Sequence, residues 1–171
     1  MFKIGDIAVY PAHGVGIIES IEERKIYGNN KRFYILRIID HEMTIMIPTD
    51  NIKNVGLRQI IDAKDVPKIY ETLMKRDLRM NAVTWNRRHR EYTEKIRSGS
   101  LFEIAEVFRD LLVLKLYKSL SFGEKKMLEM AQNLLIKEIS IAMNKHEREI
   151  EKEIWSLFNA SRKKIHVNER R

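Results

Sequence analysis

The first 57 residues alternate between apolar and polar positions in short runs that turn residues separate. Runs at 7–10, 32–39 and 44–48 are rich in β-branched and aromatic side chains, which favour β-strands. Residues 15–27 alternate in part, and the Gly-Asn-Asn stretch at 28–30 tolerates the positive φ of a tight hairpin. This pattern predicts about five short strands in a small, strongly twisted barrel of the Tudor or SH3 type.

From about Asp65 onward, the apolar positions recur at helical spacing. Asp65 is a suitable cap and Pro67 a suitable first-turn residue for a helix over 66–78, which a connector at 79–83 follows. Further helices are predicted over 85–98, 104–119, 125–146 and about 150–158.

Cap and stop residues support the ends of these helices. Thr84 can cap the helix over 85–98, and Gly99 can end it. The stretches at 100–103 and 121–124 match the capping-box pattern, in which Ser and a Glu three residues later satisfy each other's backbone N–H groups.

The change of period divides the chain into parts and predicts an α+β fold. We expect a Tudor/SH3-like barrel over 1–57, a linker over 58–64 and an all-α helical bundle over 65–160. The tail at 161–171 is basic, and we expect it to be disordered.

The charge follows the same division. The formal net charge is +8, but residues 1–57 carry seven basic and seven acidic side chains, so the whole excess lies behind them. A basic region is typical of nucleic-acid binding, although a solubilising surface explains the same charge. No apolar run approaches the ~18 residues of a membrane span, cysteine is absent, and the start is unlike a signal peptide, so we expect a cytoplasmic protein.

Motifs for catalysis are missing. No phosphate-binding Gly-rich loop of the Walker type occurs, and the two glycines of "HGVG" at 13–16 precede a predicted strand, which favours a turn. The five histidines are scattered without metal-ligand spacing. We therefore expect no enzyme activity, metal, cofactor or small-molecule substrate.

Trp85 stands at the head of a basic cluster and has two interpretations. At about 100° per residue it shares a helix face with Tyr92 and Ile96, which favours an ordinary core residue. It also follows the cap directly, and segment 75–97 has eight basic against three acidic residues. An aromatic at a cationic helix tip is typical of DNA-binding wedges, so both interpretations stay open.

The sequence resembles the CarD/CdnL family of bacterial transcription regulators over about residues 1–160. The stretches that carry the resemblance are FKIGDIAVYPAHGVG at 2–16, MTIMIPTDNIKNVGLR at 43–58, WNRRHREYTEKIRSGSLFEIAEVFRDL at 85–111 and LSFGEKKMLEMAQNLLIKEI at 120–139. Their order and spacing are specific only when taken together.

The resemblance implies that the barrel binds the β subunit of RNA polymerase by pairing of strand edges. Arg24 matches a basic position of that contact, and Met46 stands where the family has a second basic residue. Ile45 and Ile47 are further interface candidates, but these two and Tyr34 also fit the barrel core, which we favour for most of the three.

The resemblance also implies that the helical domain binds promoter DNA upstream of the melted region, with little sequence specificity. Trp85 matches the family's minor-groove wedge, and Arg87, Arg88 and Arg90 match or neighbour its DNA-contacting residues. Lys125 and Lys126 are candidate phosphate contacts. Such a protein would stabilise the open promoter complex and join the nucleoid through polymerase.

Two other functions fit the residues. One is a polymerase-interaction module without a DNA role, similar to the related domain of the transcription-repair coupling factor, whose helicase motifs this chain lacks. The other is an RNA- or ribosome-binding adaptor in which Trp85 is a core residue. The exposure of Trp85 separates these from the wedge.

Overall fold

The computed structural model describes residues 1–76 and 84–168, and side chains up to residue 161. The chain forms two compact units, Met1–Ile60 and Ile61–Arg171. Among the described residues, no helix combines the length and apolar composition needed to cross a membrane. The helix predicted over 66–78 is shorter than expected and ends at Met74, because Lys75 takes an extended backbone. Residues 77–78, the connector at 79–83 and the last residues of the tail lie outside the described part.

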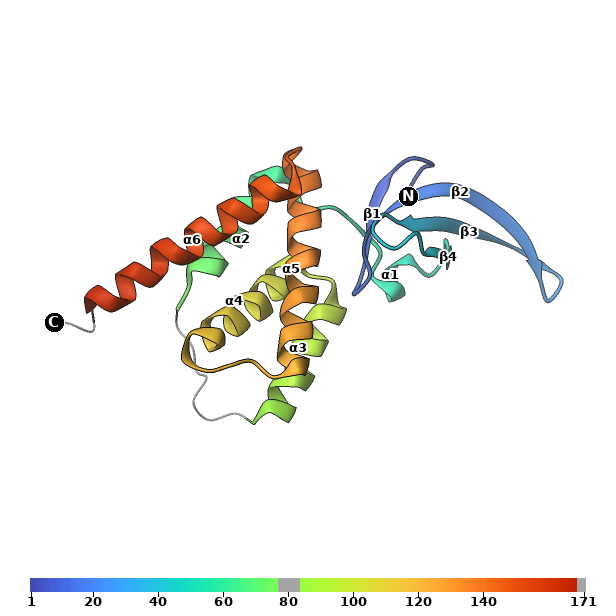
Figure 1. The fold of residues 1–171 in the computed structure, drawn as a ribbon. Helices are drawn as coiled ribbons and strands as arrows, with labels where there is room; N and C mark the ends of the chain where they lie inside the picture. The colour runs from blue at the N-terminus through green and yellow to red at the C-terminus, as the bar shows by residue number, and fades with distance from the viewer. Residues whose placement is uncertain (77–83, 169–171) are drawn as a thin grey trace. The chain divides into compact units, whose positions relative to one another are not determined.

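The N-terminal unit is an antiparallel five-stranded sheet in the order β4-β3-β2-β1-β5 (Figure 1). Its strands are β1 (Ile7–Tyr10), β2 (Gly14–Ile26), β3 (Asn29–Ile38), β4 (Thr44–Pro48) and β5 (Arg58–Gln59), with the short helix α1 (Ile52–Val55) between the last two. The α+β architecture and the strand-rich front are confirmed. One hydrophobic core fills the inner face of the sheet, and Phe2, Ile18, Tyr34 and Leu36 are among its buried members.

Two details of this unit differ from the sequence prediction. The hairpin turn is centred on Tyr27 and Gly28, and Asn29 and Asn30 already belong to β3. The expected linker over 58–64 contains β5, which pairs with β1 through Ala8 and Val9. A two-residue strand has too few positions to show a period, so the sequence pattern could not reveal it.

The C-terminal unit is helical. It contains the 3₁₀ turn η1 (Ala63–Asp65) and the helices α2 (Val66–Met74), α3 (Trp85–Ser98), α4 (Leu101–Tyr117), α5 (Phe122–Met143) and α6 (Glu147–Asn168). α4 supplies the most continuous set of buried residues, and Phe108 and Leu111 pack in a core that also takes Leu135, Ile139 and Ile150. The backbone of the tail expected to be disordered is helical as far as Asn168.

The caps behave largely as the sequence predicts. Gly99 takes a left-handed φ of 74° and ends α3, and Ser121 and Glu124 form a complete capping box at the start of α5. Ser100 caps α4 with its side chain, but its own N–H bonds to Ser98 Oγ and no reciprocal bond from Glu103 completes the box. Thr84 has the extended backbone of a cap without a side-chain hydrogen bond.

Candidate functional site

Two of the predicted interface residues, Ile45 and Ile47, lie on the inner face of the sheet. In paired strands, residues directly opposite each other share a face. Tyr34 pairs with Ile47 and Leu36 pairs with Ile45, and both β3 residues are buried in the core. Ile47 is only 2% exposed and Ile45 packs against the same core. Both side chains therefore stabilise the sheet, and while Ile47 presents almost nothing to a partner, Ile45 remains partly exposed.

The other two predicted interface residues, Arg24 and Met46, lie on the outer face of the sheet. β2 residues Glu22 and Arg24 lie opposite Phe33 and Lys31, while Met46 of β4 lies opposite Ile35. Because residues two apart on a strand share a face, Arg24 and Met46 lie on one side of the sheet. Arg24 is exposed and forms an ion pair with Glu22 at 2.9 Å, and Met46 is 42% exposed. We call Arg24 and Met46, with the buried side chains of Phe33 and Ile35 between them, the outer face.

The outer face continues onto an open strand edge. β4 is the last strand of the sheet, and Thr49 N–H and Met43 C=O bond to β3. In an antiparallel pair, alternate residues direct both backbone groups toward the partner strand. The N–H and C=O of Thr44 and Met46 therefore point away from β3, and Pro48 has no N–H to offer. Met46 is thus the centre of an edge that a strand from another protein can extend.

In the helical unit, Trp85 is the first residue of α3 and is half-buried. A β-carbon added to Gly123 would lie 3.5 Å from its Cζ2 atom, so one part of the ring lies over the first turn of α5. The ring also meets His89 edge-on, with centroids 5.3 Å apart. The indole is neither sealed in the core nor free, which leaves one part of it accessible at the helix tip.

A buried carboxylate joins the two helix tips. Glu124 of α5 is 1% exposed, and its oxygens accept the Ser121 N–H at 2.7 Å and the Lys118 ammonium at 3.0 Å. Arg88 of α3 forms an ion pair with the same carboxylate at 3.6 Å, and its side chain is only 14% exposed. Burial alone would raise the pKa of Glu124, but the Ser121 N–H and Lys118 outweigh it and lower the pKa. Arg88 therefore positions α3 instead of presenting its charge to solvent.

The remaining predicted DNA contacts lie in the open. Arg87, Arg90, Lys125 and Lys126 are all exposed in the first turns of α3 and α5. Phe122, the first residue of α5, is 75% exposed, and the Lys126 ammonium lies 4.7 Å from the centre of its ring. We call this set, with Trp85, the helix-tip surface.

Phe122 is not among the site residues that the sequence predicts. The sequence nevertheless contains a sign of its exposure, because Phe122 stands between the cap residue Ser121 and Gly123. A side chain in the first turn of a helix leans back toward the preceding loop, where it has few core residues to contact. Beside it, Tyr117, Lys118 and Lys125 line a hollow of about 610 Å³ where α4 ends and α5 begins.

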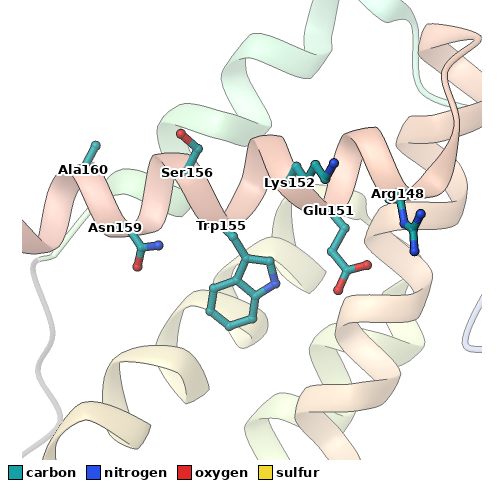
Figure 2. A pocket seen from close by; sticks show the side chains of 7 residues that line it. All are labelled: Arg148, Glu151, Lys152, Trp155, Ser156, Asn159 and Ala160. Carbon is teal, nitrogen blue, oxygen red and sulfur yellow. The ribbon is translucent and has the colours of Figure 1, made fainter.

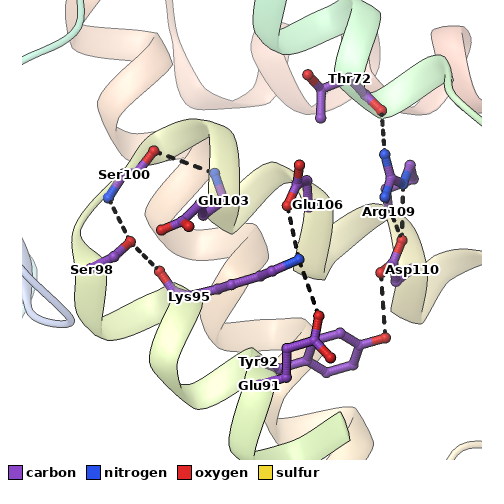
Figure 3. A network of polar contacts seen from close by, with 10 residues as sticks. All are labelled: Thr72, Glu91, Tyr92, Lys95, Ser98, Ser100, Glu103, Glu106, Arg109 and Asp110. Atoms are coloured by element: carbon purple, nitrogen blue, oxygen red, sulfur yellow. Dashed lines mark hydrogen bonds and ion pairs between the residues drawn. The ribbon is translucent and has the colours of Figure 1, made fainter. Parts of the chain in front are cut away.

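The body of α3 is held to α4 by a polar network (Figure 3). Lys95 forms ion pairs with Glu106 at 2.9 Å and with Glu91 at 3.5 Å. The Tyr92 hydroxyl lies 3.5 Å from Asp110, whose other oxygen accepts Arg109 Nε at 2.9 Å. Burial raises the pKa of Asp110 even though Arg109 opposes the shift. With Tyr92 and Ile96 buried, this network holds the inner face of α3 against α4 and leaves its arginine face outward.

Arg109 extends the same network to α2, because its Nη1 atom donates to the Thr72 carbonyl at 3.3 Å. Side-chain contacts thus tie α2, α3 and α4 together (Figure 3). Arg87 and Arg90 therefore project from a helix that side-chain contacts fix to α4.

The second tryptophan has different surroundings. Trp155 projects from α6 beside a hollow of about 830 Å³ whose lining residues, Arg148 to Ala160, all belong to that helix (Figure 2). Its ring meets Phe158 edge-on at 6.2 Å. Glu151 lies between Arg148 and Lys152 in this lining, whereas the helix-tip surface gathers cations.

Comparison with known proteins agrees with the division of the chain into a sheet unit and a helical unit. A family model described as "CarD, C-terminal domain" matches residues 68–155, and one described as "CarD-like/TRCF RID domain" matches residues 2–61. The transcription-factor candidate YdeB from Bacillus subtilis (strain 168) is 37% identical over 150 residues, which are 88% of this chain and 97% of that protein. A solved structure, CdnLNt from Myxococcus xanthus, is 49% identical and covers 36% of this chain and 86% of its own, with a TM-score of 0.31.

Proposed function

Since this chain belongs to the CarD/CdnL family of transcription regulators, which is not an enzyme family, we propose that it binds RNA polymerase through its sheet and promoter DNA through its helices. The observation that carries the DNA half is the accessible indole of Trp85 at a cationic helix tip. The surface contains four exposed cations and a second exposed aromatic, Phe122.

On the polymerase side, we infer that the β subunit adds a strand to the free edge of β4. Backbone pairing supplies affinity in such complexes, and side chains beside the edge supply specificity. Arg24 and Met46 share the outer face next to that edge. Loss of the family's basic residue at position 46 removes one ionic contact, but the outward N–H and C=O of Met46 keep the pairing available.

On the DNA side, Arg87, Arg90, Lys125 and Lys126 hold phosphates upstream of the melted region, and Trp85 enters the minor groove at the edge of the bubble. Phosphate contacts fix register and carry little sequence information. Anchoring to polymerase gives the helical unit a high effective concentration at the DNA, so weak intrinsic affinity is sufficient.

The magnitudes support a stabilising role. Opening a base step costs about a few kcal/mol, and stacking of an aromatic side chain on a base recovers roughly 1–3 kcal/mol. Because about 1.4 kcal/mol is a tenfold change in an equilibrium, one indole can shift the population of the open complex by about an order of magnitude.

The wedge is tested with Trp85→Ala in the full-length protein. We expect polymerase affinity to stay within twofold and the lifetime of the open promoter complex to fall about tenfold. Trp155→Ala is the matched control, since it removes an indole from α6 without touching the helix-tip surface. An unchanged lifetime for a folded Trp85→Ala protein would contradict the wedge and favour the module without a DNA role.

A further inference from the structure

The β2–β3 hairpin extends past the rest of its sheet. β4 pairs with β3 only from Arg37 to Phe33, and β1 pairs with β2 only as far as Ile17. The two strands continue as a ribbon with no other strand beside them, and the register ends at Ile26 and Asn29 (Figure 1). The tip of this ribbon is therefore not needed for the barrel core.

The turn at the tip uses an unfavourable residue. Tyr27 has φ of 48° and Gly28 has φ of 81°, which is the pattern of a two-residue turn of type I′. This turn favours Asn, Asp or Gly at its first position, and a bulky side chain with positive φ is a conformational outlier. The chain thus tolerates strain in order to keep an aromatic side chain at this position.

The Tyr27 ring gains nothing from its own fold. It is 99% exposed, whereas Ile26 beside it is half-buried. Strain without packing is unfavourable for the isolated protein, which points to a contact with another molecule. Tyrosine is enriched at the energetic centres of protein interfaces because it brings a large contact area at a small entropic cost.

The charge around the tip indicates the chemistry of that partner. From position 24 to 31 the chain carries Arg24, Lys25 and Lys31 and no acidic residue, although residues 1–57 as a whole carry equal numbers of basic and acidic side chains. Lys25 and Lys31 are exposed and lie on opposite faces of the ribbon. Arg24 also belongs to the outer face, so the tip continues the surface already assigned to polymerase.

We propose that the hairpin tip is a second anchor on RNA polymerase, in which Tyr27 inserts between side chains of an acidic patch that Lys25 and Lys31 complement. This inference rests on the proposed docking of the outer face. It extends that surface along the ribbon, away from the β4 edge, and assigns the strained turn a function.

The test compares Tyr27→Asn with Tyr27→Phe in the full-length chain, using purified bacterial core RNA polymerase and, separately, duplex promoter DNA as probes. Asn suits the turn and lacks the ring, so Tyr27→Asn should raise the melting temperature yet weaken polymerase binding about five- to tenfold. Tyr27→Phe keeps the ring and the strain, and it should stay within twofold of wild type in both measurements.

Polymerase affinity unchanged by Tyr27→Asn would overturn the anchor, and the proposed function would still stand if Met46→Pro weakened binding in the same assay. Wild-type protein that fails to bind polymerase at all would instead reject the proposed function. If Tyr27→Asn lowered the affinity for duplex DNA in the absence of polymerase, the tip would contact nucleic acid, and the proposal that it contacts polymerase would be wrong.

Discussion

The sheet and the helical unit offer their proposed partners opposite kinds of surface. The β4 edge presents backbone groups, which nearly every residue supplies, so Met46 can replace a basic residue without removing the pairing. The helix-tip surface presents particular side chains, and its geometry depends on the buried Glu124 between two helices. The first surface should therefore resist side-chain changes and fail when the backbone changes, whereas the second should behave in the reverse way.

The largest effect is expected from Met46→Pro. Proline removes the outward N–H and fills the edge with its ring, but edge strands tolerate it because that N–H is not used within the sheet. Polymerase affinity should fall tenfold or more, with the melting temperature of the chain nearly unchanged. Met46→Ala is the control and should cost less than threefold, since it shortens the side chain and keeps the edge. Equal losses for both variants would show that the side chain, not the backbone, makes the contact.

Glu124→Gln tests the support of the helix-tip surface. Glutamine keeps the shape and the capping hydrogen bond of α5 but removes the counter-charge of Arg88 and Lys118. Removing the negative charge that Lys118 and the largely shielded Arg88 contact should cost about 1–3 kcal/mol of unfolding free energy. DNA affinity should fall as well, while polymerase affinity stays constant. Chemical denaturation and the two binding assays measure these effects.

The same carboxylate predicts a pH dependence. Because folding lowers the pKa of Glu124, its stabilisation is present above the ordinary value of 4.5 and is lost as the pH falls through the folded pKa. The stability difference between wild type and Glu124→Gln should therefore shrink below about pH 4.5. Taking this difference cancels the opposite trend from Asp110, whose pKa burial raises. A difference that is constant through this range would show that charge at position 124 is unimportant.

The smallest effects are expected from single arginines. Arg87→Ala or Arg90→Ala should weaken DNA binding similarly for all sequences and lower the salt slope of log K by about one unit each. Arg97→Ala, which removes an exposed arginine from the last turn of α3, is the matched control. A slope that stays at the wild-type value for Arg87→Ala would argue against a phosphate contact there.

The local signals of the sequence were reliable where a single residue decides the geometry. Gly99 and the Ser121–Glu124 box end and begin helices as predicted, because a left-handed φ and a reciprocal cap need only nearby atoms. Ile47 and Arg88 illustrate what such signals miss. The first is a core residue through its pairing with Tyr34, and the second turns inward to a carboxylate 36 positions later in the chain.

The sequence by itself therefore determined the two-part α+β organisation, the neutral front, the basic back and the helix carrying Trp85, since period, charge and caps are properties of neighbouring residues. Only the tertiary structure decided which side chains can meet a partner. Strand register placed Ile45 and Ile47 on the inner face and Arg24 and Met46 on the outer face. Contact between the first turns of α3 and α5 left Trp85 half-exposed near Phe122. Exposure depends on contacts between segments far apart in the chain, and no local pattern encodes those contacts.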